Sequence, residues 1–193
     1  VKNDLAAQNN FSLEGFALDQ TSVIYYEDPK TGQDVVLQKL YGGANRTWVK
    51  YEDIPKNLIH ACIAIEDKRF MEHQGVDWVT TMRACLKMFL GSGSAGGSTI
   101  TQQLVKNVTG NREVTVRRKL AEIYSALKLE KEYTKEEIME WYLNVIALGQ
   151  NCEGVQSAAQ VYFGKNVEEL DLAQCASLIG ITNNPSIYDP YLN

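Results

Sequence analysis

Residues 58–75 read Leu-Ile-His-Ala-Cys-Ile-Ala-Ile-Glu-Asp-Lys-Arg-Phe-Met-Glu-His-Gln-Gly, an apolar run that ends on two adjacent carboxylates. At helical spacing, the first carboxylate, Glu66, shares its face with Ile59, Cys62 and Ile63. A carboxylate on an apolar face loses hydration, which favours its uptake of a proton and suits a general base or acid. For this stretch alone, the alternative is that Glu66 only forms a structural ion pair with Lys68 or Arg69.

Downstream lies a second motif, Gly-Gly-Ser-Thr-Ile-Thr-Gln-Gln-Leu-Val-Lys-Asn at residues 96–107. Thr99 and Gln102 have the spacing of a capping box, which predicts a helix start. Gln103 and Lys106 fall on the same face, so this helix should present amides and an ammonium group on one side. Its N-terminus, preceded by glycines, is suited to binding anions. A solvated polar face is the alternative.

A third feature is a basic cluster at the start of a long helix expected over residues 112–131. The helix dipole disfavours cations at that end, so Arg117, Arg118 and Lys119 suggest a ligand. The alternative is a solvated basic face that pairs internally with Glu122. The expected buried stripe of this helix comprises Leu120, Ile123, Tyr124 and Leu127.

The remaining pattern predicts a mainly α fold with one short N-terminal β-hairpin. Strands are expected over residues 22–26 and 34–40, joined by a turn that contains Pro29 and Gly32. Further helices are expected over 53–66, 76–90, 134–145, 154–163 and 171–181. The first of these begins near Pro55, with Asp53 as its capping candidate. We expect an N-terminal segment, 1–52, and a catalytic domain, 53–193.

Five motifs in this order resemble those of the peptidoglycan glycosyltransferases, the lipid II polymerases of class A penicillin-binding proteins and monofunctional wall transglycosylases. They cover about residues 53–190. The motifs are Glu66-Asp67-x-x-Phe70-x-x-His73-x-Gly75, residues 96–104, Arg118-Lys119-x-x-Glu122, residues 137–144 (Glu-Ile-Met-Glu-Trp-Tyr-Leu-Asn) and residues 162–165 (Tyr-Phe-Gly-Lys).

The resemblance implies a lysozyme-like helical domain with a smaller membrane-facing lobe. It implies that Glu66 is the general base that deprotonates the 4-hydroxyl of an acceptor lipid II, and that Glu122 is a second catalytic glutamate. No cofactor is obligatory, although a divalent cation, Mg²⁺ or Mn²⁺, could bind near Glu122. Moenomycin should compete for the site. The implied substrate-binding residues are Asp67, Phe70, His73, Ser98, Thr99, Gln102, Gln103, Lys106, Arg118, Lys119 and Asn144.

The chain departs from this family pattern at two positions near the second glutamate. A lysine often precedes that glutamate, and here the position is Ala121. A basic residue is often found eight positions before it, where this chain has Val114, with Arg112 the nearest candidate. The departures concern the completeness of the cation cluster and leave the resemblance intact.

Composition and length limit the function classes. The chain has 193 residues and a net charge of -5, which argues against a nucleic-acid partner. No apolar run approaches the ~20 residues that span a bilayer. Because the chain starts at Val1, we expect a fragment whose parent is anchored by an upstream transmembrane helix at the extracytoplasmic face of the bacterial membrane. The expected partners are lipid II, the growing lipid-linked glycan strand, the membrane surface and cell-wall synthesis proteins. In bifunctional relatives a transpeptidase domain follows.

The helix expected over residues 76–90 carries an apolar stripe: Trp78, Met82, Cys85, Leu86 and Phe89. Such a stripe suits either an ordinary core-facing helix or a helix that lies in the membrane interface. The family resemblance favours the membrane. Cysteine spacing excludes a Cys-x-x-Cys motif, and we expect four free thiols, of Cys62, Cys85, Cys152 and Cys175.

Two other function classes fit parts of the pattern. A lysozyme-like glycan hydrolase also needs two carboxylates, but it does not need the Gln/Lys helix or the basic cluster. A non-catalytic scaffold of wall synthesis could keep the fold, although retention of Glu66 and Glu122 argues against it.

Overall fold

The structure, a computed structural model, describes residues 12–13, 22–40, 45–89 and 96–192. Its elements, in chain order, are β1 (Ser22–Glu27), β2 (Asp34–Leu40), η3 (Tyr51–Asp53), α2 (Lys56–Glu66), α3 (Trp78–Phe89), α4 (Ile100–Thr109), α5 (Val116–Glu132), α6 (Lys135–Val145), α7 (Val155–Phe163), η4 (Val167–Glu169), α8 (Leu172–Asn183) and α9 (Pro185–Tyr188).

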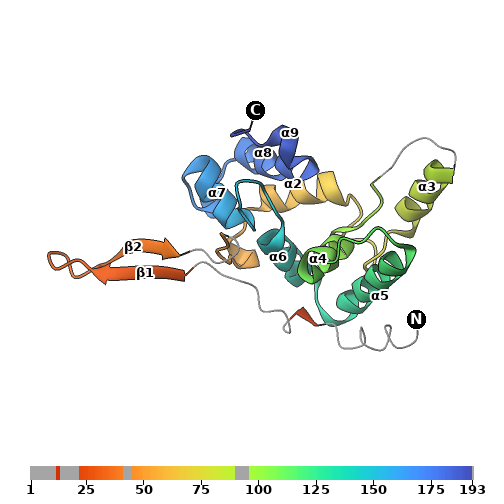
Figure 1. Cartoon of the computed structure of the whole chain (residues 1–193), viewed down its shortest axis with the longest axis horizontal. Helices are drawn as coiled ribbons and strands as arrows, with labels where there is room; N and C mark the ends of the chain where they lie inside the picture. The colour runs from red at the N-terminus through yellow and green to blue at the C-terminus, as the bar shows by residue number, and fades with distance from the viewer. Residues whose placement is uncertain (1–11, 14–21, 41–44, 90–95, 193) are drawn as a thin grey trace.

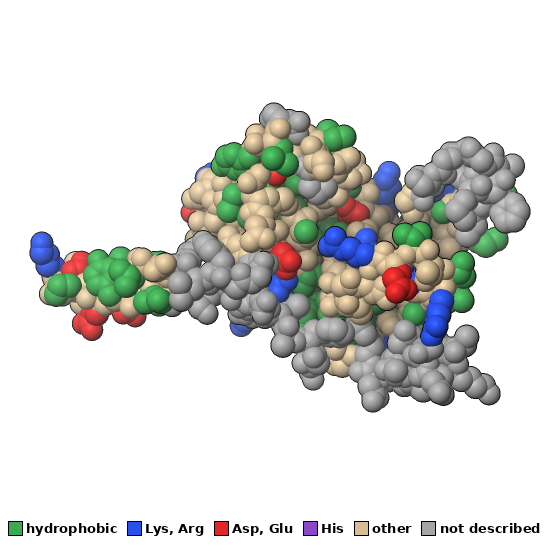
Figure 2. Space-filling model, in the orientation of Figure 1, with side chains coloured by type: hydrophobic (Ala, Val, Ile, Leu, Met, Phe, Trp, Pro, Cys, Tyr) green, Lys and Arg blue, Asp and Glu red, His purple; other side chains and the backbone are tan. Residues whose placement is uncertain are grey.

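The N-terminal hairpin is confirmed. β1 and β2 pair antiparallel, with a register shift between Ile24 and Tyr25. Figure 1 shows the hairpin projecting from one side of the helical body, and Figure 2 shows apolar side chains gathered on it. Its described apolar side chains are exposed on both faces. The hairpin therefore adds little to the core, which lies among the helices.

Helix α6 lies inside the body, where it packs against α4, α5 and α7 (Figure 1). The predicted capping box is present: the Thr134 side chain accepts from the Glu137 backbone, and the Glu137 side chain accepts from the Thr134 backbone. Most of the rest of the helix is buried: Ile138, Met139, Tyr142, Leu143, Asn144 and Val145. The predicted mainly α fold class is confirmed, with α6 buried between α4, α5 and α7, while α2 packs against α8.

The predicted start of α2 needs a correction. Asp53 does not cap this helix; it ends the preceding one-turn 3₁₀ helix, η3, and Pro55 occupies the N-cap position without a side-chain cap. The carbonyl of Pro55 instead accepts from the backbone N–H groups of Leu58 and Ile59, at 2.9 and 3.2 Å. Proline suits a helix start because its φ is already close to the helical value.

The predicted buried stripe of α5 is wrong for two of its four residues, while Ile123 and Leu127 are partly buried. Leu120 and Tyr124 are 61% and 40% exposed. The buried positions are Glu122, Ser125, Ala126 and Leu129. The helix also begins four residues later than predicted, at Val116, where Thr115 caps it by accepting from the backbone N–H of Arg118.

Close contact with the α5 backbone explains the glycine at the end of the Glu66 motif. Gly75 has φ +87°, and a Cβ added there would lie 2.6 Å from the backbone oxygen of Ala126. The turn at Gly75 therefore rests directly on the α5 backbone and leaves no room for a side chain at position 75.

Helix α3 exposes its apolar stripe, for which the sequence allowed either a core-facing or a membrane-interface position. Trp78, Met82 and Leu86 are 57%, 69% and 62% exposed, so the core-facing alternative is wrong for these three residues. The side chains of Cys85 and Phe89, like residues 90–95, lie outside the described part of the chain. The other three cysteines, Cys62, Cys152 and Cys175, are buried free thiols, as predicted.

Asp77 fixes the first turn of α3. Its carboxylate accepts from the backbone N–H of Thr80 at 2.9 Å and from the Thr80 hydroxyl at 2.6 Å, and it pairs with the Arg69 guanidinium. Arg69 and these hydrogen bonds hold the pKa of the Asp77 carboxyl well below its usual range. The ionised form therefore contributes stability at pH values above the usual Asp pKa of about 3.9, and this contribution is lost as the pH falls through the lower folded-state value.

We predict that Asp77→Asn lowers the free energy of unfolding by about 1–2 kcal/mol at pH 7, because the charged partner of Arg69 is lost while the amide oxygen can still cap the helix. The difference from wild type should shrink at about pH 3, where the unfolded-state carboxyl is protonated. Urea denaturation at the two pH values measures it. Glu168→Gln, at an exposed position, is the control. An equal loss at both pH values would refute the electrostatic explanation.

Candidate functional site

Glu66 is the last residue of α2, and its carboxylate is held from two other helices. Gln103 Nε2 of α4 donates to Glu66 Oε2 at 2.8 Å. The Thr182 hydroxyl of α8 lies 2.6 Å from Glu66 Oε1. The C-terminal end of a helix is an unfavourable place for a negative charge, so these two donors offset a cost that α2 itself imposes.

The Glu66 side chain borders a cavity of about 380 Å³. Cationic and hydroxyl side chains share the lining with the carboxylate: Lys68, Arg69, Arg83, Ser98, Thr99 and Thr80, together with Ile65, Asp67, Asp77, Gly96 and Gly97. The ion-pair alternative for Glu66 is not the arrangement found here, because Arg69 pairs with Asp77 and the bonds described for Glu66 go to an amide and a hydroxyl.

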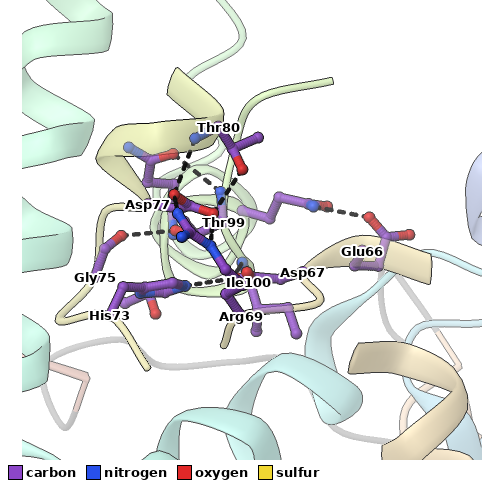
Figure 3. A network of polar contacts seen from close by, with 12 residues as sticks. Glu66, Asp67, Arg69, His73, Gly75, Asp77, Thr80, Thr99 and Ile100 are labelled. Carbon is purple, nitrogen blue, oxygen red and sulfur yellow. Dashed lines mark hydrogen bonds and ion pairs between the residues drawn. The ribbon is translucent and has the colours of Figure 1, made fainter. Parts of the chain in front are cut away.

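Asp67, next to Glu66, joins the end of α2 to the start of α4. Its Oδ2 accepts from the backbone N–H of Ile100 at 3.1 Å and lies 2.8 Å from His73 Nε2 (Figure 3). The Thr99 hydroxyl donates to the backbone oxygen of Gly75 at 2.7 Å across the same junction. The N-terminus of α4, predicted to bind an anion, therefore already holds the carboxylate of Asp67.

Three predicted substrate-binding residues are largely enclosed by protein. Phe70 is 1% exposed, and Lys135 Nζ lies 4.4 Å from the centre of its ring. The His73 side chain is 8% exposed. Asn144 is fully buried: it accepts from the backbone N–H of Val49 at 2.8 Å and donates to the Val49 oxygen at 2.7 Å. The contacts described for these three residues are structural, and a role in binding substrate stays a prediction.

A second group of predicted residues gathers where α5 meets α4. Glu122 is 5% exposed, and its two carboxylate oxygens accept from Arg118 and Lys119. Lys119 Nζ also donates to Ser98 Oγ at 2.8 Å, and it lies 3.5 Å from Gln102 Oε1. The sequence placed Gln102 on an open face, but the structure buries it completely in the α4 capping box.

The cation cluster borders a smaller cavity, of about 90 Å³. It is lined by Val105, Lys106, Thr109, Asn111, Arg118, Ala121, Glu122 and Ser125. This region thus contains three cationic side chains, Lys106, Arg118 and Lys119, and one carboxylate, that of Glu122. The excess of positive charge suits a di-anionic group. Ser98 lines the larger cavity and bonds to Lys119, so it links the two regions.

The residues around Glu122 do not fit a divalent cation. Its two oxygens are taken up by cationic side chains. In the described ranges 22–40, 45–89 and 96–192, no group of three or more His, Cys, Asp or Glu side chains could hold a metal ion. We derive no step that depends on a metal.

The sequence did not identify Thr182 as a site residue. It lies in the last turn of α8 and is separated from Glu66 by 116 positions. Nothing in the local pattern marks it, since it sits in an apolar helix before Asn184-Pro185. Only the packing of α2 against α8 brings the two side chains together.

Comparisons with known proteins identify the family of the chain. A family model described as Transglycosylase matches residues 33–193. Penicillin-binding protein 1A of Clostridium botulinum (strain Langeland) is 40% identical over 178 residues, covering 90% of this chain and 21% of the relative. The proteins of the same name from Pseudomonas aeruginosa and Neisseria gonorrhoeae are 42% and 45% identical, covering 88% and 80% of this chain and 20% and 19% of the relatives.

The chain thus spans about a fifth of the length of these relatives. The family model covers well over half of the chain, and the carboxylate and cation groups described above lie within it. The chain therefore belongs to the transglycosylase family, the peptidoglycan glycosyltransferases whose motifs it carries.

Proposed function

We propose that this domain polymerises lipid II into glycan strands, with Glu66 as the general base. One observation carries the proposal: Glu66 lines a cavity whose lining also includes Ser98, and Ser98 accepts a hydrogen bond from Lys119, one of three cationic side chains in the neighbouring region. A reaction that removes a proton at one point and releases a pyrophosphate at another needs such a pair of regions.

In the proposed reaction, Glu66 takes the proton of the acceptor 4-hydroxyl as that oxygen attacks the anomeric carbon of the donor. The new carbon–oxygen bond forms on the face opposite the leaving group, so the configuration inverts. The bond to the pyrophosphate breaks, and its electron pair leaves with undecaprenyl pyrophosphate. The donors on Glu66 hold the carboxylate in one orientation, which shortens the search for a reactive geometry.

The leaving pyrophosphate gains negative charge as its bond breaks, and Lys106, Arg118 and Lys119 are placed to stabilise it. Arginine offers a planar fork of donors and lysine a point charge. The excess positive charge makes this group better matched to the departing anion than to a neutral sugar. Glu122 keeps Arg118 and Lys119 in position, because it accepts from each.

The same contacts disfavour a glycan hydrolase. An inverting hydrolase needs a second carboxyl group that donates a proton to the leaving oxygen or activates water. Glu122 is 5% exposed and bonded to two cations, so it is poorly placed for either task. A scaffold without activity would not need Glu66 to face a cavity.

The exposed stripe of α3 supports a membrane-surface site of action. Trp78, Met82 and Leu86 lie one turn apart on one side of the helix and are more than half exposed. In the described part of the chain, no helix is long and apolar enough to span a bilayer. We therefore propose that α3 lies in the interface at the extracytoplasmic face. Docking with cell-wall synthesis proteins and anchoring by an upstream helix stay predictions.

The first prediction concerns the base. Glu66→Gln should abolish polymerisation, because an amide keeps the shape of the side chain but cannot take the proton. A general base contributes about 10²–10⁴-fold in rate. The assay incubates the purified domain with labelled lipid II and resolves chain length on a gel, with melting temperature as the folding control. Retention of more than about a tenth of the wild-type rate would remove Glu66 from this role.

The second prediction concerns the leaving group. Lys106→Ala should lower kcat/KM for lipid II about tenfold or more, since a charge-assisted hydrogen bond is worth about 1.5–3 kcal/mol. It should also weaken the binding of labelled moenomycin. Lys106 is exposed, so the melting temperature should hold. Lys131→Ala is the matched control, since Lys131 is an exposed lysine in the last turn of α5, at the end opposite Arg118 and Lys119. Unchanged kcat/KM and moenomycin binding would show that Lys106 does not contact the anion.

The third prediction concerns the membrane. Leu86→Ser should reduce binding to vesicles that contain anionic lipid and slow polymerisation there, with little change in melting temperature. Leu172→Ser is the matched control, since Leu172 on α8 is 65% exposed and Leu86 is 62% exposed. Loss of a buried leucine would cost about 2–5 kcal/mol. A large drop in melting temperature with normal vesicle binding would show that Leu86 packs in the core and does not contact the membrane.

A further inference from the structure

The hydroxyl of Thr182 stands between two acceptors. Its Oγ1 lies 2.6 Å from Glu66 Oε1 and 2.7 Å from the backbone oxygen of Ile179, one turn earlier in α8. Both distances are hydrogen-bond lengths. A threonine hydroxyl carries one proton and two lone pairs, so it can donate to only one of these oxygens at a time.

Which acceptor receives the proton depends on the state of Glu66. When Glu66 is ionised, its carboxylate can only accept, so Thr182 donates to Oε1 and makes a charge-assisted bond. When Glu66 is protonated, its O–H can donate to Thr182 Oγ1, and the threonine proton can turn to the Ile179 oxygen. Rotation of the Thr182 hydroxyl about its Cβ–Oγ1 bond thus keeps Thr182 and Glu66 hydrogen-bonded to each other in both protonation states of Glu66.

Gln103 cannot do the same on the other oxygen. Its Nε2 donates to Glu66 Oε2, and its Oε1 lies 3.3 Å from the hydroxyl of Tyr142, which keeps the amide in this orientation. An amide nitrogen can donate but cannot accept. Gln103 therefore favours a carboxylate oxygen without a proton, and Oε1, beside Thr182, is the oxygen on which a proton is accommodated.

We infer that Thr182 is a positioning residue for the base: it orients Glu66 while the carboxylate is ionised, and it accepts a hydrogen bond from Glu66 once the acceptor proton has arrived. The inference rests on the proposed function of Glu66. The proton balance closes, because the proton that leaves the acceptor hydroxyl is carried by Glu66 and then released to solvent, and Thr182 keeps its own proton throughout.

The test is the pH dependence of lipid II polymerisation by the purified domain. Thr182→Val removes the hydroxyl and keeps the shape of the side chain. Because the ionised form of the base loses a charge-assisted donor, the acid limb of the pH–rate profile should move to higher pH by about one unit, with about a tenfold lower rate on that limb. Thr182→Ser keeps the hydroxyl and should restore the wild-type profile.

Ser177→Ala is the matched control. Ser177 also lies on α8, and its hydroxyl donates to the backbone oxygen of Ala173 at 2.8 Å. Its removal should leave the profile unchanged. If Thr182→Val does not fold, Thr182→Ala is tested in the same way; if neither variant folds, Thr182 is a structural residue and the inference is wrong.

Other outcomes separate this inference from the proposed function. An unchanged profile in Thr182→Val, or a rate that falls equally at every pH, overturns the role of Thr182 and leaves Glu66 as the base. If the wild-type domain makes no polymer, or if Glu66→Gln is as active as wild type, the proposed function itself fails, and the role of Thr182 fails with it.

Discussion

The bond between the Asp67 carboxylate and the backbone N–H of Ile100 fixes the position of the site. It places a negative charge on the positive end of α4 at the point where α2 stops. Because Glu66 directly precedes Asp67, this junction also sets where the Glu66 carboxylate lies relative to Gln103, one turn into α4. Thr99 and Gly75 close the same junction from the other side (Figure 3). The motif from Glu66 to Gly75, proposed to carry the chemistry, therefore also connects α2 to α4.

Helix α5 places polar side chains in buried positions next to Arg118 and Lys119. Its inward face buries Glu122 and Ser125, while Leu120 and Tyr124 are left in contact with solvent. A buried carboxylate is tolerated only when it is paired and hydrogen-bonded, and here Arg118 and Lys119 do this. Their charge in turn needs Glu122. The two side chains that satisfy this buried carboxylate are thus also among those proposed to bind the anion, and a site of this kind departs from an ordinary apolar pattern.

How well the sequence predicted each interaction depends on how far apart its two partners lie along the chain. The capping boxes at Thr99 and Thr134 were visible because their partners are three residues away. The α5 stripe was predicted wrongly at Leu120 and Tyr124 because the buried face includes the polar Glu122 and Ser125 beside Ala126 and Leu129, a mixture that apolar periodicity does not detect. Thr182 could not be found, since no local pattern encodes a contact across 116 positions. The family motifs supplied Glu66 and the cations, whereas packing decided that Phe70 and Asn144 are enclosed.

The Glu66 carboxylate, the proposed base, is held by side chains from α4 and α8, while α2 carries it. None of the three helices could fix the carboxylate alone, because a glutamate at a helix end has free rotamers and an unfavourable dipole. Packing of α2 against α8 and of α4 against α6 supplies the missing constraint. In the proposed reaction, pre-organisation of this kind would require no rearrangement of the two donors when the proton moves. The apolar side chains that α3 exposes, which we propose to contact lipid, belong to a different helix from the three that hold the carboxylate.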